Sequence, residues 1–235
     1  MTETQELKMQ LLDKFGSSRD HETVEFCRKA YEFLKDEPKA GITKVVAEQV
    51  AQRIDNAIPN GIYLVYADGS VELFNDNTAK PVEKVAGIGI KQGDWALVVD
   101  LHDQANGEEI TLTTKKGSET YKGYKDNYLD AVADWNGKAN TEHLIAIGLN
   151  ERIELKETQY IPSLGEMYFI YMNLKAVNKA LEFVGGTPIE RDWYWTSTES
   201  SATYAWLLGL ASGDVTNTTK ASNTLRVRAV SAFIL

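Results

Sequence analysis

The stretch that decides the fold runs from Asp192 to Glu199 and reads Asp-Trp-Tyr-Trp-Thr-Ser-Thr-Glu. Aromatic and β-branched residues dominate it, which is typical of a strand packed into a core. Two stiff segments follow, a predicted hairpin strand at 205–210 and the alternating segment 225–233. Runs of small polar residues lie between these three segments, so predicted strands alternate with predicted loops.

The polar runs at 200–204 and 211–224 predict a ligand-binding face, because side chains can vary there while the backbone stays in place. Tyrosine gives a large contact area for little loss of side-chain freedom, so we expect Tyr204 and an exposed Leu207 to be the anchors. The predicted ligand-binding residues are Ser200, Ser201, Thr203, Tyr204, Leu207, Gly209, Ala211, Ser212, Asp214, Thr216, Asn217, Thr218, Thr219, Ser222, Asn223 and Thr224.

A period of two along 204–211 predicts which side chains point inward. The tryptophans Trp193, Trp195 and Trp206 belong to the rigid segments, so they are expected to pack in the core and not to stack on a ligand. The side chains predicted to face the core are Trp206, Leu208 and Leu210, and those predicted to face outward are Leu207, Gly209 and Ala211.

Composition limits the class of protein. The chain has 235 residues, 43% of them hydrophobic, which is enough for a core in one large or two small domains. Its formal net charge is -9, and Lys and Arg never exceed two in a row, so nucleic acid is excluded as a partner. No apolar run is long enough for a membrane span, so no membrane insertion is expected.

The first residues and the single cysteine predict a cellular context. Residues 1–6 carry acids where a secretory signal carries bases, and no apolar segment follows, so the chain is expected to start in the cytoplasm. Cys27 cannot form an internal disulfide. Its helical flanks favour a buried structural thiol over a metal ligand.

Residues 1–58 are predicted to be helical, because apolar residues recur there at spacings of three and four. About three such helices cannot bury both faces alone. We therefore expect an attachment or oligomerisation region that docks on another domain, on a virion partner or on copies of itself. Pro59-Asn60-Gly61 marks the boundary to a second domain, 59–235.

The second domain is predicted to be α+β, with helices in the middle and strands at both ends. Helices are expected at 127–135 and 141–149, and a longer one begins with a capping box of Ser163 and Glu166 and ends at Gly185. The segment 103–127 has the polar composition of a loop. Strands are expected at 62–66, 71–74, 85–90 and a central 95–101, the first two joined by an Asp68-Gly69 turn.

Several polar residues allow two interpretations. One of Arg226 and Arg228 is expected to be a buried partner of Glu199 and the other to be solvated. Asp134, Asn136 and Asn140 have side chains that a metal-binding loop could use, but the sequence around them lacks the further ligands that calcium requires. A turn and a helix N-cap are therefore the better interpretation of these residues.

An ordered set of short motifs spans the second domain. In chain order they are Asp134-x-Asn136-Gly137-x-x-Asn140-Thr141, Ile161-Pro162-Ser163-Leu164-Gly165-Glu166, Asn178-x-Ala180-Leu181, Gly185-Gly186, Tyr194-Trp195-x-Ser197-Thr198-Glu199, Ala205-Trp206, Gly213 and Val227-Arg228-Ala229-Val230-Ser231-Ala232-Phe233. Together they resemble the C-type-lectin-like domain, also called the formylglycine-generating-enzyme-like fold, of phage and bacterial surface-binding proteins. The resemblance covers about residues 60–235 and is strongest to members diversified by retroelements in gut Bacteroidales and their phages.

This resemblance implies a fold in which the N- and C-terminal strands pair, two helices flank the sheet, and the C-terminal hairpins present the ligand. In the diversified members, template adenines are randomised, and variable positions do not become Lys, Glu, Gln, Met or Trp. Residues 200–225 hold two residues of these types, Trp206 and Lys220, and both are assigned to the rigid frame.

The fold that the chain resembles also houses enzymes, so fold alone does not exclude catalysis. Its copper oxidases use two cysteines and its iron enzymes a histidine cluster, whereas His21, His102 and His143 are scattered here. No nucleophile elbow or phosphate-binding glycine loop occurs. We therefore expect no enzyme, no cofactor and no metal ion. The calcium-dependent sugar motifs of true lectins are also missing, so the sequence leaves carbohydrate open as a ligand but does not support it.

The expected function is receptor binding through the C-terminal hairpins, with a cell-surface protein or glycan as the partner. The expected setting is a phage or prophage tail tip, assembled in the cytoplasm, where many weak contacts add up. A bacterial surface adhesin and a structural virion protein without ligand selection are the alternatives.

Overall fold

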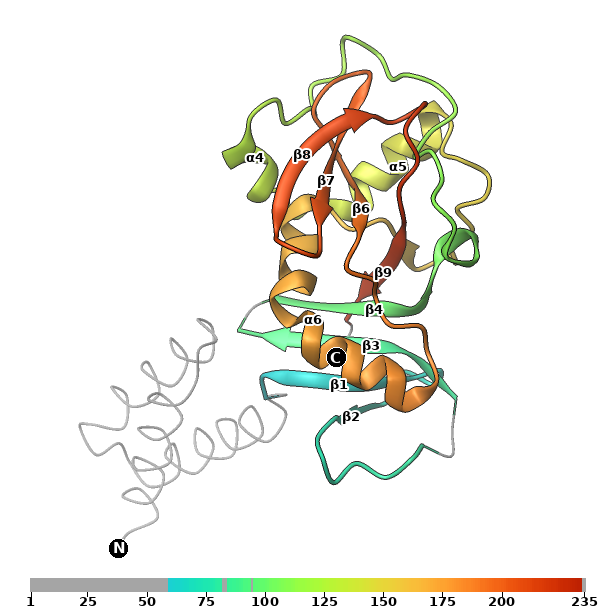
Figure 1. Cartoon of the computed structure of the whole chain (residues 1–235), viewed down its shortest axis with the longest axis vertical. Helices are drawn as coiled ribbons and strands as arrows, with labels where there is room; N and C mark the ends of the chain where they lie inside the picture. The colour runs from blue at the N-terminus through green and yellow to red at the C-terminus, as the bar shows by residue number, and fades with distance from the viewer. Residues whose placement is uncertain (1–58, 82–83, 94, 234–235) are drawn as a thin grey trace, which may run out of the picture. The chain divides into compact units, whose positions relative to one another are not determined.

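The computed structural model describes residues 59–81, 84–93 and 95–233 (Figure 1). These residues form helices and two β-sheets, as the predicted α+β class requires. The predicted helical region 1–58, with Cys27 and His21, lies outside the described residues, and its role and the boundary beside it stay predictions. Among the described residues, none of the helices has the length and apolarity that crossing a membrane requires.

The first hairpin is confirmed. Strand β1 (Gly61–Tyr66) pairs antiparallel with β2 (Val71–Leu73). The Asp68 carboxylate accepts a hydrogen bond from the Ser70 backbone N–H at 2.9 Å, and Gly69 has φ +87°. An aspartate followed by a glycine thus closes the turn by the local chemistry that the sequence predicts.

The larger sheet has six strands in the order β2-β1-β3-β4-β9-β5. Strand β4 (Trp95–Asp103) lies inside the sheet, next to β3 (Val85–Gln92), as its apolar sequence predicts. The last strand, β9 (Arg228–Ala232), pairs with β4 and with the short β5 (Gln159–Tyr160). The expected pairing of the first and last strands is therefore wrong for the described residues, because β3 and β4 separate β1 from β9.

Helix α6 (Leu164–Val184) begins and ends where predicted. Ser163 and Glu166 form the reciprocal capping box, and Gly185 closes the helix in the left-handed conformation. Its apolar stripe, which includes Phe169 and Ile170, is buried in the main hydrophobic core.

The two short helices differ in one respect from the prediction. Helix α4 (Tyr128–Val132) lies within the expected range, but α5 (Gly137–Ile147) begins at Gly137, directly after the N-cap Asn136. The residues expected to separate the helices therefore start the second one. The Asp134 carboxylate accepts hydrogen bonds from the Asn136 backbone and from the Asn140 and Thr198 side chains. The turn is thus confirmed, and Asn136 occupies the N-cap position of α5 but makes no side-chain capping hydrogen bond.

The second sheet has the order β6-β7-β8, formed by β6 (Trp193–Glu199), β7 (Tyr204–Gly209) and β8 (Asp214–Thr219). In Figure 1 these strands lie above the larger sheet. Trp206 and Leu208 enter the main core, as predicted. Trp195 is fully buried, and its indole N–H donates to the Ile110 carbonyl at 2.8 Å, so its packing role is confirmed.

The predicted exposure of Leu207 and Gly209 is wrong. Leu207 is only 4% exposed and belongs to a second core with Leu112 and Leu144. Gly209 is buried, and the Trp193 ring lies 3.1 Å from where a Cβ on residue 209 would stand. The alternation along β7 is correct, but both faces of this sheet are covered. Leu207 is a core residue and not an anchor for a ligand.

Candidate functional site

The predicted binding residues, apart from Leu207 and Gly209, are at least partly exposed. We call these exposed and partly exposed members the C-terminal face. Tyr204 is its largest side chain and is 41% exposed. The C-terminal face consists of Ser200, Ser201, Thr203, Tyr204, Ala211, Ser212, Asp214, Thr216, Asn217, Thr218, Thr219, Ser222, Asn223 and Thr224.

The structure divides this face between the two ends of the β7–β8 hairpin. One end holds 200–204 together with 218–224, and Tyr204 lies opposite Thr219 in the sheet. The other end holds the turn 211–214. Six residues of β8 span the distance between the ends, about 17 Å at the usual rise of a strand. Exposed Thr216 and Asn217 join the two ends along β8.

Strand β8 is the outer strand of its sheet, and no other strand of the described residues pairs with its free side. Its exposed side chains are short and polar. An open strand edge offers backbone N–H and C=O groups to a partner, and flanking side chains add selectivity. The middle of the C-terminal face can therefore make backbone as well as side-chain contacts.

The loops at the first end are held by hydrogen bonds between their own side chains. The Asn223 amide donates to the hydroxyls of Thr218 and Thr219, at 2.8 and 2.6 Å. The Ser201 hydroxyl accepts from the backbone N–H groups of Thr203 and Tyr204. These local bonds hold both loops in shape before a ligand arrives, which lowers the entropic cost of binding.

A buried polar cluster lies beneath the end of the face that holds 200–204 and 218–224. Lys220, with a fully buried side chain, forms an ion pair with Glu199, and His143 Nδ1 lies 2.5 Å from the other Glu199 oxygen. The ring of Tyr121 stacks on His143 with centroids 3.6 Å apart. Burial lowers the pKa of Lys220 to about 8. Burial and the nearby Lys220 lower the pKa of His143.

The predicted arginine partner of Glu199 is wrong. Arg228 is fully buried, but its Nε faces the Asp103 carboxylate at 2.5 Å. Arg226 is partly buried and pairs with Asp192 at 3.1 Å, so it is not simply solvated. The register of β6 against β7 is irregular between Trp195 and Glu199, and Glu199 lies opposite Ala205.

Aromatic side chains that the sequence did not predict as part of the site surround the second end. The Tyr168 hydroxyl donates to the Gly213 carbonyl at 2.8 Å. Gly213 has φ +82°, and a Cβ there would lie 2.9 Å from the Tyr171 ring. Burial and a hydrogen bond with Tyr128 raise the pKa of Tyr168 to about 12, and the charge of Asp214 adds to this.

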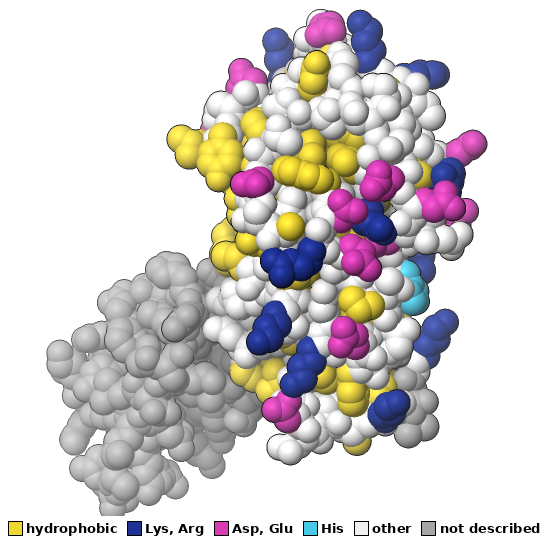
Figure 2. Space-filling view, in the orientation of Figure 1, with side chains coloured by type: hydrophobic (Ala, Val, Ile, Leu, Met, Phe, Trp, Pro, Cys, Tyr) yellow, Lys and Arg dark blue, Asp and Glu magenta, His cyan; other side chains and the backbone are white. Residues whose placement is uncertain are grey.

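Exposed apolar side chains extend this aromatic group. Helix α4 packs against α6 and presents Tyr128 and Leu129, which are 48% and 73% exposed. Met172 of α6, 69% exposed, lies one helical turn after Tyr168. Figure 2 shows hydrophobic side chains gathered on the side where α4 and β8 lie. The turn end of the face therefore combines polar loop atoms with an apolar surface, as binding surfaces commonly do.

The described residues contain no group of three or more His, Cys, Asp and Glu side chains that could hold a metal ion. His102 is bonded to the Thr187 hydroxyl, at 2.8 Å. The expectations of no cofactor and no enzymatic activity stay expectations.

The described residues form an α+β protein with two sheets. No model of a known protein family matches the sequence, and no curated protein matches it. The fold is similar to a crystal structure of a fimbrial protein from Bacteroides ovatus, with a TM-score of 0.53 and 18% sequence identity. The match covers 74% of this chain and 49% of that chain, so this chain matches about half of the fimbrial protein. The similarity shows a shared fold, and the C-type-lectin-like assignment stays a prediction.

Proposed function

We propose that this protein is an adhesive ligand-binding protein whose C-terminal face attaches to a protein or glycan on a cell surface. The observation that carries this proposal is the free edge of β8, which lies between two polar ends of one hairpin. A rigid strand with open backbone groups and short polar side chains suits contact with a large partner.

The frame beneath the face supports this proposal. Trp195 and Trp206 fix the sheet, and their indole N–H groups donate to backbone carbonyls at 2.8 and 2.7 Å. The pair of Glu199 and Lys220 fixes the strand ends. Side chains such as Thr216 and Asn217 can therefore be replaced without moving the backbone. A receptor-binding face that varies among related proteins needs this division between frame and surface.

Two settings are open for such a protein. The shared fold with part of a fimbrial protein from Bacteroides ovatus favours a bacterial surface adhesin. A phage or prophage tail tip, in which a retroelement diversifies the face, is the setting that the motif resemblance implies. Residues 1–58 would attach the protein to copies of itself or to a virion partner in either setting.

Retention of coated beads tests the adhesive function. Beads that carry the full chain are washed over intact Bacteroides ovatus cells and over immobilised mucin. We expect retention on at least one layer, well above that of albumin-coated beads, because many weak contacts act together. Soluble full chain in excess should release the beads. Retention no better than that of albumin beads on both layers, or retention that the soluble chain does not reduce, would contradict the proposal.

The gene itself tests the diversified setting. We expect an imperfect DNA repeat of the codons for 192–233 near the gene, with mismatches confined to adenines and a reverse transcriptase gene beside it. A genome without such a repeat would mean that no retroelement diversifies the face, and it would favour the surface adhesin.

A further inference from the structure

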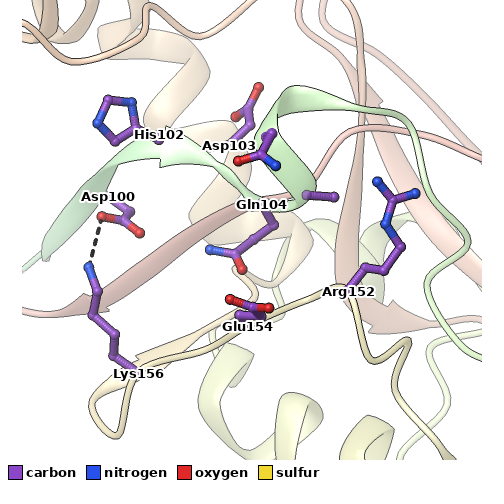
Figure 3. A pocket seen from close by; sticks show the side chains of 9 residues that line it. Asp100, His102, Asp103, Gln104, Arg152, Glu154 and Lys156 are labelled. Carbon is purple, nitrogen blue, oxygen red and sulfur yellow. Dashed lines mark ion pairs between the residues drawn. The ribbon is translucent and has the colours of Figure 1, made fainter.

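A pocket of about 290 Å³ lies beside the end of β4, and none of its residues belongs to the C-terminal face (Figure 3). One wall comes from β4 and the following turn η1 (Gln104–Gly107). The other wall comes from the segment 152–156. The pocket is lined by Asp100, His102, Asp103, Gln104, Ala105, Asn106, Arg152, Glu154 and Lys156.

Gln104 is the unusual residue of this pocket. The residue is only 8% exposed, yet its side-chain amide has no hydrogen-bond partner among the described residues. In Figure 3 the amide points into the pocket, toward the Glu154 carboxylate. The amide lines the pocket, and no described residue competes for its hydrogen-bonding groups. Its donor and its acceptor are both available to a ligand.

The backbone that carries Gln104 is held in a costly conformation. Ala105 and Asn106 both have positive φ, at 52° and 55°, which non-glycine residues seldom adopt. The guanidinium of Arg226 donates to the Gly107 carbonyl at 2.6 Å, and the Gln104 backbone N–H donates to the Val227 carbonyl at 2.8 Å. These contacts fix the turn and keep the Gln104 side chain directed into the pocket. Strain of this kind tends to occur at functional sites.

The charges that line the pocket limit the kind of ligand. Lys156 lies 3.6 Å from Asp100, and Arg152 is bonded to Glu108 at 2.6 Å. Glu154 forms no ion pair or hydrogen bond with a described residue, so its oxygens are free to accept. An anionic ligand would be repelled by the carboxylates that line the pocket, and a cationic ligand would be repelled by Arg152 and Lys156. A neutral ligand rich in groups that both donate and accept hydrogen bonds avoids both penalties.

We propose that this pocket binds a single ring of a neutral sugar, with Gln104 and Glu154 as its main hydrogen-bonding partners. Each sugar hydroxyl is at once a donor and an acceptor, so neighbouring hydroxyls can engage the amide and the carboxylate together. The volume suits one ring and lies at the small end of the range for ligand pockets. Ala105 is the one apolar side chain of the lining, in keeping with a polar ligand.

Two variants separate a ligand contact from a structural role. Gln104→Met keeps the size of the side chain and removes the amide. Because that amide has no described partner, the urea midpoint of unfolding should stay unchanged or rise, whereas a structural amide would lower it. Glu154→Ala removes an exposed carboxylate. Glu157→Ala, an exposed neighbour outside the pocket, is the matched control.

Saturation-transfer NMR with the full chain and a panel of single sugars provides the measurement. The panel contains galactose, glucose, mannose, fucose and N-acetylglucosamine, with N-acetylneuraminic acid and glucosamine as anionic and cationic probes. We expect at least one neutral sugar to bind and each pocket variant to weaken it at least about tenfold, with E157A unchanged.

Three results would overturn the proposal: no neutral sugar binds, binding is unchanged in both pocket variants, or the charged probes bind as well as the neutral ones. If Gln104→Met fails to fold, the amide is structural, and the proposal then fails as well. A variant of the C-terminal face, Thr216→Lys with Asn217→Lys, should leave sugar binding intact, so failure of the adhesive face and failure of this pocket are distinguishable.

Discussion

Lys220 and Glu199 form a buried ion pair that joins the residue after β8 to the last residue of β6. The two loops of the C-terminal face start from these residues, at 200 and 221. The Lys220 carbonyl also accepts from the backbone of Leu112 and Thr113, so the pair fixes a third segment. The shape of one end of the face therefore depends on two charges that are buried beneath it.

Lys220→Met tests this dependence. The variant leaves the Glu199 carboxylate buried without its cation, and we expect a loss of about 3–5 kcal/mol in the free energy of unfolding. Urea denaturation measures it. The control is the double variant Glu199→Gln with Lys220→Met, which removes both charges and should recover a large part of the loss. Equal losses in the single and double variants would show that the pairing does not matter.

His143 should make stability depend on pH. Its pKa in the folded protein is lowered from 6.5, so the unfolded chain takes up the proton first as the pH falls. The stabilisation from neutral His143 is therefore present above pH 6.5 and is lost progressively below it. We expect the melting temperature of wild type to fall more than that of His143→Gln between about pH 8 and pH 5.5. Parallel curves for the two proteins would rule out this role.

Two glycines with similar backbone angles form a matched pair. Gly69 and Gly213 have φ +87° and +82°, but only Gly213 has a neighbour, the Tyr171 ring, at the place of a Cβ. Gly69→Ala should cost about 1–2 kcal/mol from the backbone alone. Gly213→Ala should cost about 1–3 kcal/mol more, because the ring must also move. Thermal unfolding compares the two, and equal costs would mean that the aromatic contact is loose.

Leu207 should behave as a core residue. Leu207→Ala is expected to cost about 2–5 kcal/mol, because it leaves a cavity beside Leu112 and Leu144. Thr216 lies opposite it on β8 and is exposed. Thr216→Ala should change stability by no more than about 0.5 kcal/mol. A mild effect of the leucine substitution would return Leu207 to the candidate binding residues.

The parts of the fold that the sequence predicts correctly depend on short-range chemistry. The capping box of Ser163 and Glu166 and the turn at Asp68-Gly69 each involve residues within a few positions of one another. The alternation along β7 is of the same kind. Such features need no knowledge of what packs against them.

The errors arise where distant segments meet. Leu207 is buried because Leu112 and Leu144 cover a sheet face that the local pattern leaves open. Glu199 pairs with Lys220, which lies 21 residues later in the chain, and no local pattern connects the two. The turn beside the pocket has positive φ at Ala105 and Asn106; asparagine tolerates that conformation, but alanine does not predict it. A sequence pattern gives the side of a strand on which a residue lies, but not what covers that side.

The most direct test of the central claim is bead retention with two charge-matched variants. Thr216→Lys with Asn217→Lys places two lysines on the free edge of β8, and Asn77→Lys with Ala79→Lys places two on exposed positions between β2 and β3. Both should fold like wild type. On the cell or mucin layer that retains wild-type beads, we predict that retention of the β8 variant falls at least about tenfold. Retention of the second variant should equal that of wild type. Equal retention of the two variants would contradict a binding role for the C-terminal face.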